Sequence, residues 1–327
     1  MYEGAFKIIT SIISAFFKAF IIILSAIFVS CNGQPAENSD FDFDYFGQQT
    51  PGNEAQIFAP EIVSKQGRFE MGFSISTDGN FLAYGVASET EERQTAIHMM
   101  RRLNNTWKDL GTEWLNSNER TYFPMFSNDH NSLFFAKEIG SYAADLYQVY
   151  LNDSLKNQAR PLSPVINSHA REASIGLIDE TIYYISNHEG DACCGDIFVT
   201  TKKENGEYKK PKLVSALSSD ADEESLYVDP KGRYMIIQAW KNEDNSKYDL
   251  YISYTNRDGN WTSPERLSTS INTAAIEQRP FVTPDDQYLF FSRVTETKNN
   301  EGNIFESDIY WVSTAEVFQN APFSHKN

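Results

Sequence analysis

The chain has 327 residues, with 28 Lys or Arg against 45 Asp or Glu, so its formal net charge is −17 at pH 7. A surface this acidic disfavours nucleic acid and anionic membranes as partners, because both carry negative charge themselves. It suits a periplasmic or cell-surface protein that binds cations, sugars or basic protein patches. The length is ample for one all-β domain with short terminal segments.

The first thirty residues form a targeting segment. Lys7 and Lys18 supply positive charge, and residues 19–29 are a mainly apolar run, too short for a bilayer span of about 20 apolar residues. The run ends in Phe28-Val29-Ser30-Cys31, which resembles a bacterial lipobox with Phe in place of the usual Leu. The resemblance implies a lipoprotein signal peptide over residues 1–30 and lipidation of Cys31; the alternative is an ordinary secreted protein.

Residues 31–55 are polar and acidic, a composition typical of a flexible tether. A lipid anchor followed by a tether predicts a protein of the bacterial cell envelope, on the periplasmic or cell-surface side of the outer membrane. Its contact with the membrane would be through the anchor alone. The folded domain is then expected over residues 56–318, followed by a tail over residues 319–327.

One glutamate position recurs along the domain. It is occupied by Glu70, Glu172, Glu223 and Glu277, with Thr121 in the remaining place. The steps between these positions are 51, 51, 51 and 54 residues. Each lies six residues before a turn, of which Ser76-Thr77-Asp78-Gly79 is an example. A fixed period near fifty indicates one supersecondary unit stacked repeatedly.

Each repeat has the signals of four strands. The second strand is rich in aromatic and β-branched residues, as a buried middle strand should be. These second strands are expected at 81–86, 133–137, 182–186, 234–239 and 288–293. The third strand opens with an aspartate at Asp145, Asp196, Asp249 and Asp308. Hairpin turns such as Asp258-Gly259 then lead to a fourth, outer strand.

The domain contains five opening turns but only four internal outer strands. The missing outer strand is found before the first repeat, in residues 59–64. Pairing this strand with the last repeat, at residues 308–313, would close a ring and remove its exposed sheet edges. We therefore predict an all-β fold, a five-bladed β-propeller of four-stranded blades closed by the N-terminal strand. Six blades are the alternative.

The last repeat resembles a known family. Its residues 280–285 read Pro-Phe-Val-Thr-Pro-Asp, followed by Leu289-Phe290-Phe291 and Asp308-Ile309-Tyr310. This pattern is similar to the TolB-like, WD-repeat-like β-propeller repeats, and the resemblance covers roughly residues 59–313. It is strongest to five-repeat, lipid-anchored members from Bacteroidetes-type bacteria. The resemblance implies the fold but only loosely a function, since propellers serve as binding scaffolds and as enzymes alike.

The recurrent glutamates are the leading candidate site for ligand binding. Residues just before the inner strands of a propeller gather at one opening of its channel, where like carboxylates raise one another's pKa. A cation, basic side chains or hydrogen-bond donors are then needed to neutralise them. The basic candidates are Arg68, Arg171 and Arg279, which would alternate with the glutamates. Alternatively, each glutamate accepts hydrogen bonds from backbone amides of a neighbouring blade and has a structural role.

No catalytic residue set is recognisable in the sequence. None of the five histidines has a recognisable spacing to a serine or cysteine, and no phosphate loop, dinucleotide fingerprint or calcium loop is found. Three interpretations of the adjacent Cys193 and Cys194 stay open: two thiols without a special role, a strained vicinal disulfide, or a metal-binding or redox role. We expect no metal site and no cofactor, with a divalent cation at the glutamates as the alternative.

These observations favour a membrane-anchored envelope lipoprotein whose propeller binds or scaffolds a protein, peptide or glycan at the channel mouth. The alternative is a carbohydrate-active enzyme, because glycoside hydrolases use carboxylates about 5–10 Å apart. Glutamates repeated in like settings disfavour that alternative, since a catalytic acid and a nucleophile need different pKa values. Enzymatic activity is left open, with a non-enzymatic role favoured.

Overall fold

The structure is a computed structural model. It describes residues 41–87, 95–115, 119–129, 131–140, 143–151, 159–187, 194–220, 222–240, 247–299, 302–319 and 321–322. All of them belong to one compact unit, Phe41–Asn327. No helix in this part of the chain has the length and apolar composition that a membrane span requires.

The described part is nearly all-β, and its strands repeat in groups. The first strands of the groups are β2 (Phe69–Ile75), β6 (Thr121–Phe126), β10 (Glu172–Ile178), β14 (Asp222–Val228) and β18 (Ile276–Val282). The second strands are β3 (Phe81–Ala87), β7 (Ser132–Gly140), β11 (Thr181–Ser186), β15 (Tyr234–Trp240) and β19 (Tyr288–Asn299). The third strands are β4 (Thr95–Leu103), β8 (Ala143–Tyr150), β12 (Asp196–Thr201), β16 (Tyr248–Tyr254) and β20 (Gly302–Ser313).

Shorter elements complete the groups. The fourth strands are β5 (Thr106–Gly111), β9 (Arg160–Pro161), β13 (Lys212–Leu213) and β17 (Glu265–Arg266). One further strand, β1 (Gln56–Ile57), precedes the first group. Two single-turn 3-10 helices, η1 (Tyr45–Gly47) and η2 (Glu113–Leu115), are the helical segments of the described residues.

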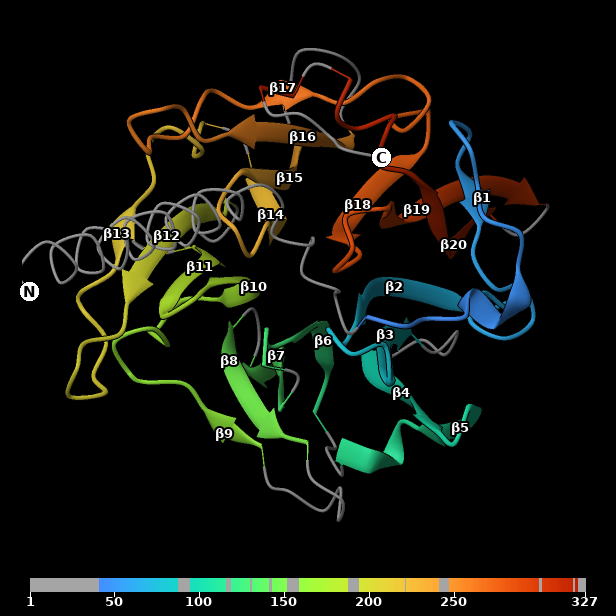
Figure 1. The fold of residues 1–327 in the computed structure, drawn as a ribbon, viewed down its shortest axis with the longest axis horizontal. Helices are drawn as coiled ribbons and strands as arrows, with labels where there is room; N and C mark the ends of the chain where they lie inside the picture. Colours follow the sequence, from blue (N-terminus) through green and yellow to red (C-terminus); the bar gives the residue numbers. More distant parts are fainter. Residues whose placement is uncertain are drawn as a thin grey trace, which may run out of the picture. The chain divides into compact units, whose positions relative to one another are not determined.

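Strand pairing follows the sequence order within each group. Strands β6–β9, β10–β13 and β14–β17 each form a four-stranded sheet. Strands β18–β20 join β2–β5, and with β1 paired to β20 they form an eight-stranded sheet. That junction is one parallel pairing, between Phe69 and Ser307. The sheets surround a common centre, and β2, β6, β10, β14 and β18 lie nearest to it (Figure 1). Each of these five inner strands contacts the two that flank it.

The N-terminal strand was predicted in the wrong residues. Residues 59–64 form a turn, because the amides of Ile62 and Val63 donate to the carbonyl oxygen of Ala59. Ala59 and Glu61 have positive φ angles there, which a strand does not allow. The strand that pairs with β20 comes earlier, with Gln56 opposite Trp311 and Ile57 opposite Tyr310.

The predicted tether also differs from the structure, over residues 41–55. Phe43 is 6% exposed, and its ring centroid lies 5.4 Å from that of Trp107. The Trp107 Nε1 donates to Asp44 Oδ1 at 3.0 Å. Aromatic side chains spaced along this acidic segment give it apolar surface to bury, so these residues pack on the domain. Residues 31–40 lie outside the described part.

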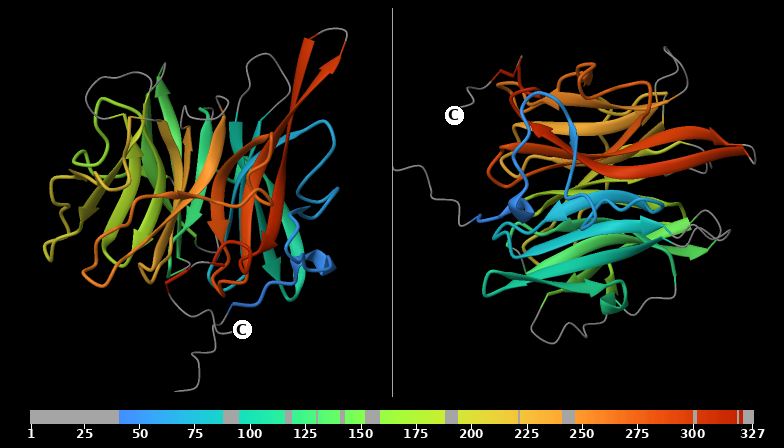
Figure 2. Two further views of the ribbon diagram at one scale, coloured as in Figure 1. Left: turned by 90° about the horizontal axis from the view of Figure 1, so that it is seen from above. Right: turned by 90° about the vertical axis from the view of Figure 1, so that its right-hand side faces the viewer.

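The core fills the space between neighbouring sheets. Its largest fully buried side chains are aromatic, and they include Trp311, Tyr84 and Phe290. Phe73 on β2 and Phe290 on β19 stack with their centroids 4.4 Å apart, so adjacent strand groups are joined through rings. The β19–β20 hairpin extends beyond the other strands (Figure 2). The inner strands are thereby held rigidly around the centre where the candidate site lies.

Candidate functional site

The four recurrent glutamates begin or nearly begin their inner strands, and all are buried with 0% exposure. Three of them accept hydrogen bonds from the residue four positions earlier. Glu172 accepts from Ser168 N at 2.9 Å and Ser168 Oγ at 2.5 Å. Glu223 accepts from Ser219, and Glu277 from Thr273, through the same two groups. The carboxylate therefore fixes the loop that leads into its strand.

Glu70 departs from this pattern because the residue four positions earlier is Gln66. Its carboxylate accepts from Lys65 N at 3.3 Å and from the Arg68 guanidinium. Burial raises the pKa of the Glu70 carboxyl, although these donors oppose the shift. Burial likewise raises the pKa of Glu277 against its own donors. Hydrogen-bond donors thus stabilise each carboxylate locally, as in the structural alternative. They come from the adjoining loop or from the second strand of the same group, not from a neighbouring blade.

The expected alternation of arginines and glutamates is seen only at Arg68. Arg171 binds the carboxylate of Glu224, with N–O distances of 2.9 and 2.6 Å. Glu277 is held by Arg293 Nε at 2.8 Å, an arginine that the sequence analysis did not select. Arg279 makes no hydrogen bond to any of the four glutamates among the contacts of the described residues. Arg171 and Glu277 therefore bind partners that lie far from them in sequence and are brought close by the fold.

The four recurrent carboxylates are fully buried, so they do not form an exposed cluster among the described residues. No group of three or more His, Cys, Asp or Glu side chains in this part of the chain is placed to hold a metal ion. The physical reason lies in the inner strands, each of which has an irregular register, between Met71 and Phe73 in β2, for example. The corresponding shifts occur in β6, β10, β14 and β18. A β-bulge breaks the alternation of faces, so residues two apart no longer point the same way.

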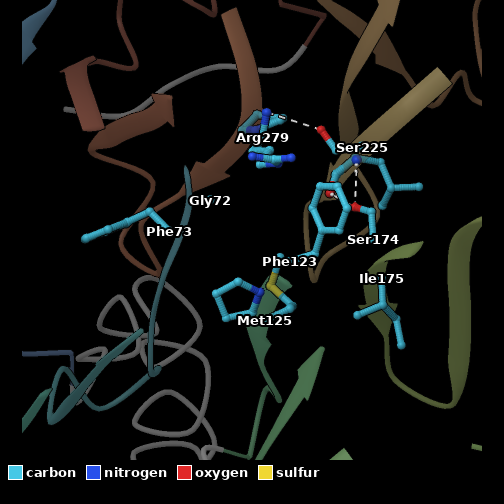
Figure 3. Close-up of a pocket in the computed structure, with 11 residues that line it drawn as sticks. Gly72, Phe73, Phe123, Met125, Ser174, Ile175, Ser225 and Arg279 are labelled. Atoms are coloured by element: carbon cyan, nitrogen blue, oxygen red, sulfur yellow. Dashed lines mark hydrogen bonds between the residues drawn. The ribbon is translucent and has the colours of Figure 1, made fainter. Parts of the chain in front are cut away.

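A second recurrent position meets at the centre instead. Two residues after each glutamate position come Gly72, Phe123, Ser174, Ser225 and Arg279, which we name the axial ring. They surround one cavity, and each comes from a different inner strand (Figure 3). The other described lining residues are Phe73, Pro124, Met125, Ile175, Leu226 and Pro280. None of the four glutamates lines it.

The backbone of the axial ring is adapted to this position. Gly72, Phe123, Ser174 and Arg279 have φ angles of 61°, 55°, 42° and 56°. Such angles are costly for Phe and Arg, and the bulges impose them. A Cβ atom at Gly72 would lie 3.4 Å from Arg279 Cδ. Glycine thus leaves room for the arginine side chain beside it.

Arg279 is the only charged residue among the described lining residues. Its guanidinium carbon lies 4.7 Å from the centroid of the Phe123 ring, within cation–π range. The Nε and Nη1 atoms are buried and have no hydrogen-bond partner among the described residues. Burial lowers the pKa of Arg279 to about 10. The group therefore carries a positive charge at neutral pH.

A polar network of Tyr122, Arg171, Asp222, Glu224 and Tyr248 lies close enough to influence Arg279. Four of its members, all but Asp222, shift the pKa of Arg279 electrostatically. Tyr248 donates its hydroxyl to Asp222 Oδ2 at 2.5 Å, and Gly195 N donates to Asp222 Oδ1 at 2.8 Å. The acidic run at residues 220–224 has the composition of a solvated loop or of a weak calcium site. In the structure, Asp222, Glu223 and Glu224 instead form hydrogen bonds with three separate sets of partners.

The sequence contained a signal for the axial ring that we did not use. Its members are spaced by the same 51, 51, 51 and 54 residues as the glutamate positions, but they differ in residue type. Other candidates cannot be placed: Cys31 and Cys193 lie outside the described residues, so lipidation and the cysteine pair remain predictions.

The comparisons with known proteins bear on the fold. No protein-family model matches the sequence, and no curated protein matches it. Among solved structures, the chain is similar to an N-acetylgalactosamine deacetylase from F. plautii in complex with blood group B trisaccharide. That match has 9% identity and a TM-score of 0.51, and it covers 85% of this chain and 99% of the other.

Two further similarities have lower coverage of the other protein. An exo-β-1,3-galactanase from Clostridium thermocellum matches with 10% identity and a TM-score of 0.50, over 79% of this chain and 62% of that chain. TolB from Acinetobacter baumannii matches with 16% identity and a TM-score of 0.42, over 75% of this chain. The chain spans 54% of the length of that TolB. The first two neighbours, with TM-scores of 0.51 and 0.50, support a β-propeller fold for the domain, and none of the three carries anything about its activity.

Proposed function

We propose that the protein is a non-catalytic binding module whose axial cavity and polar network receive a group of a protein, peptide or glycan ligand. The observation that carries this proposal is at Arg279, a partly exposed residue whose Nε and Nη1 atoms are buried and have no partner among the described residues. Burying donors without partners costs stability, and such costs concentrate at functional sites. A ligand at the cavity would supply the missing acceptors.

The alternative of a glycoside hydrolase has less support. Its chemistry needs two carboxylates that flank the scissile bond. The described lining of the cavity contains no carboxylate, and the four recurrent glutamates are fully buried. We therefore propose Arg279 and Arg171 as ligand-binding residues and give the glutamates, with Arg68, a structural role.

We also propose five blades, with β1 completing the blade of β18–β20. The pairing of β1 with β20 and the five successive groups of strands along the chain support this. The double variant Ile57→Cys/Tyr310→Cys tests it, because these residues are opposite each other. A disulfide should form in the folded protein under mild oxidation and be visible by mass spectrometry. Its absence would contradict this closure.

We further propose that the protein is an envelope lipoprotein anchored through Cys31, of the Bacteroidetes-type TolB-like group, with no cofactor. The lipobox-like Phe28-Val29-Ser30-Cys31 supports the anchor. In cells, Cys31→Ser should move the protein from the membrane fraction to the soluble fraction. Added EDTA should leave its melting temperature unchanged; a drop would indicate a bound divalent cation.

The binding proposal is tested by screening the purified protein against glycan and peptide arrays while assaying the same oligosaccharides for cleavage. We expect a bound ligand and no product. Cleavage that is lost in Glu172→Gln or Glu277→Gln would overturn the proposal in favour of the enzyme. An array without any bound ligand would also contradict it.

A further inference from the structure

Among the described side chains that line the axial cavity, the hydrogen-bond donors without a partner belong to Arg279. The two lining serines are already engaged within the protein. Ser225 Oγ donates to Gln238 Oε1 at 2.6 Å, and Ser174 Oγ accepts from Leu226 N at 3.0 Å. The remaining side-chain donors of the described lining are those of Arg279, so the site favours a group that accepts hydrogen bonds.

Arg279 also has no ion-pair partner of its own among the described residues, although Glu224 attracts it electrostatically. In the polar network, Arg171 is paired with Glu224, and the Asp222 carboxylate receives the Tyr248 hydroxyl and the Gly195 amide. The walls beside the guanidinium are formed by Phe123, Pro124 and Met125, among other apolar residues. In such surroundings an ion pair is stronger than in water. An entering acceptor with a negative charge is therefore favoured over a neutral one.

The size of the cavity limits that acceptor. The volume open to the centre of a water molecule is about 20 Å³, and roughly 10–15 Å³ on this measure holds one water. The space fits a small group, such as the two oxygens of a planar carboxylate, and not a sugar ring. A guanidinium matches a carboxylate in planarity and donor spacing.

We propose that Arg279 anchors a single carboxylate group of a ligand inside the axial cavity. The inference rests on the proposed binding function, since it names the chemical group that the site accepts. The remainder of the ligand would lie outside the cavity, beside Arg171 and Tyr248. A peptide with a free C-terminus and an acidic sugar both offer this group, and the experiment separates them.

The first test measures the melting temperature of the full chain with sodium acetate, with acetamide, and with sodium chloride at equal ionic strength. At ten times its dissociation constant, acetate should raise the melting temperature by roughly 3–5 °C more than chloride does. Acetamide should have no effect. The same measurement is then made with N-acetylglycine, which represents a peptide C-terminus, and with glucuronate, an acidic sugar. The neutral controls are N-acetylglycine amide and glucose, respectively. The larger shift in melting temperature identifies the source of carboxylate that binds more tightly.

Variants assign the effect to the residue. Arg279→Met should abolish the acetate response, and Arg279→Lys should weaken it, because lysine keeps the charge without the fork of donors. Arg266→Met is the matched control, since Arg266 lies on β17 and pairs with Asp249. It should keep the full response. Broadening of the ¹³C resonance of labelled acetate by the wild-type protein gives a readout that depends on no variant.

The outcomes are distinguishable. Equal effects of acetate and chloride, or an unchanged acetate response in Arg279→Met, would overturn the inference. An array ligand that Arg279→Met binds as tightly as the wild type does would overturn it while leaving the binding function intact. Acetate binding without any array ligand would support the anion site and contradict the wider function.

Discussion

The glutamate positions and the axial ring repeat with the same period and lie only two residues apart, yet they differ in every other respect. Four of the five glutamate positions hold the same residue, fully buried and supplied with local donors. The axial ring holds Gly72, Phe123, Ser174, Ser225 and Arg279, and its one charged member has buried donors without described partners. One bulge per inner strand separates the two sets.

This difference indicates how to interpret a repeat. A residue kept identical in each unit solves a problem that every unit shares, here the fixing of the loop before the inner strand. A position that recurs with the same period but varies in residue type meets a requirement of the whole molecule, such as ligand binding. Removing a glutamate should therefore lower stability, whereas removing Arg279 should lower binding alone.

The largest expected effect is that of Glu277→Ala. This change removes the acceptor of Thr273 N, Thr273 Oγ1 and Arg293 Nε, and Arg293 is left largely buried without its carboxylate. The free energy of unfolding should fall by roughly 3–5 kcal/mol, measured by urea denaturation. Glu207→Ala is the control, in an exposed hairpin, and should leave the unfolding midpoint unchanged. A loss below about 1 kcal/mol at Glu277 would contradict its structural role.

A somewhat smaller loss is expected for Arg171→Met. Arg171 and Glu224 join β10 to β14 through two hydrogen bonds, and each is about one-fifth exposed. The free energy of unfolding should fall by about 2 kcal/mol, because the Glu224 carboxylate loses a charged partner in a partly buried place. The double variant Arg171→Met/Glu224→Gln should recover part of this loss. If the double variant recovers none of the loss, the interaction between Arg171 and Glu224 contributes nothing to the free energy of unfolding beyond the contacts that each residue makes separately.

The pH dependence of Glu277 gives a sharper but smaller effect. Burial raises its pKa in the folded protein above the ordinary value of 4.5, so the folded state binds this proton more tightly than the unfolded state does. Its stabilising contribution is full below pH 4.5 and is lost as the pH rises through the folded pKa. Relative to Glu277→Gln, which does not titrate, the wild type should gain stability between pH 7 and pH 4.5. Denaturation curves at both values test this, and a constant difference would contradict it.

Several parts of this structure could be predicted from the sequence because they depend on local signals. The turn at Asp229-Pro230-Lys231-Gly232 and the apolar run after it predict β15 over residues 234–239, and the strand is Tyr234–Trp240. The period of the repeats led to the all-β propeller in the same way. These features arise within single units, where turn chemistry and strand propensity act over a few residues.

The site could not be predicted because it depends on register and on contacts between units. The bulge at Gly72 or Arg279 changes which face a side chain takes, and no local pattern marks it. The pairing of Arg171 with Glu224 joins residues 53 apart in sequence. The burial of Phe43 required the docking of a segment whose composition resembles a tether.

The most direct test of the contrast between the two sets is the free energy of unfolding of Arg279→Met, measured in chloride buffer without added carboxylate. Methionine keeps an unbranched side chain at this backbone position and removes the buried donors that lack partners. We predict a free energy of unfolding equal to that of the wild type or higher by up to about 1 kcal/mol. A loss comparable to that of Glu277→Ala would contradict the assignment of Arg279 to ligand binding and make it one more structural residue.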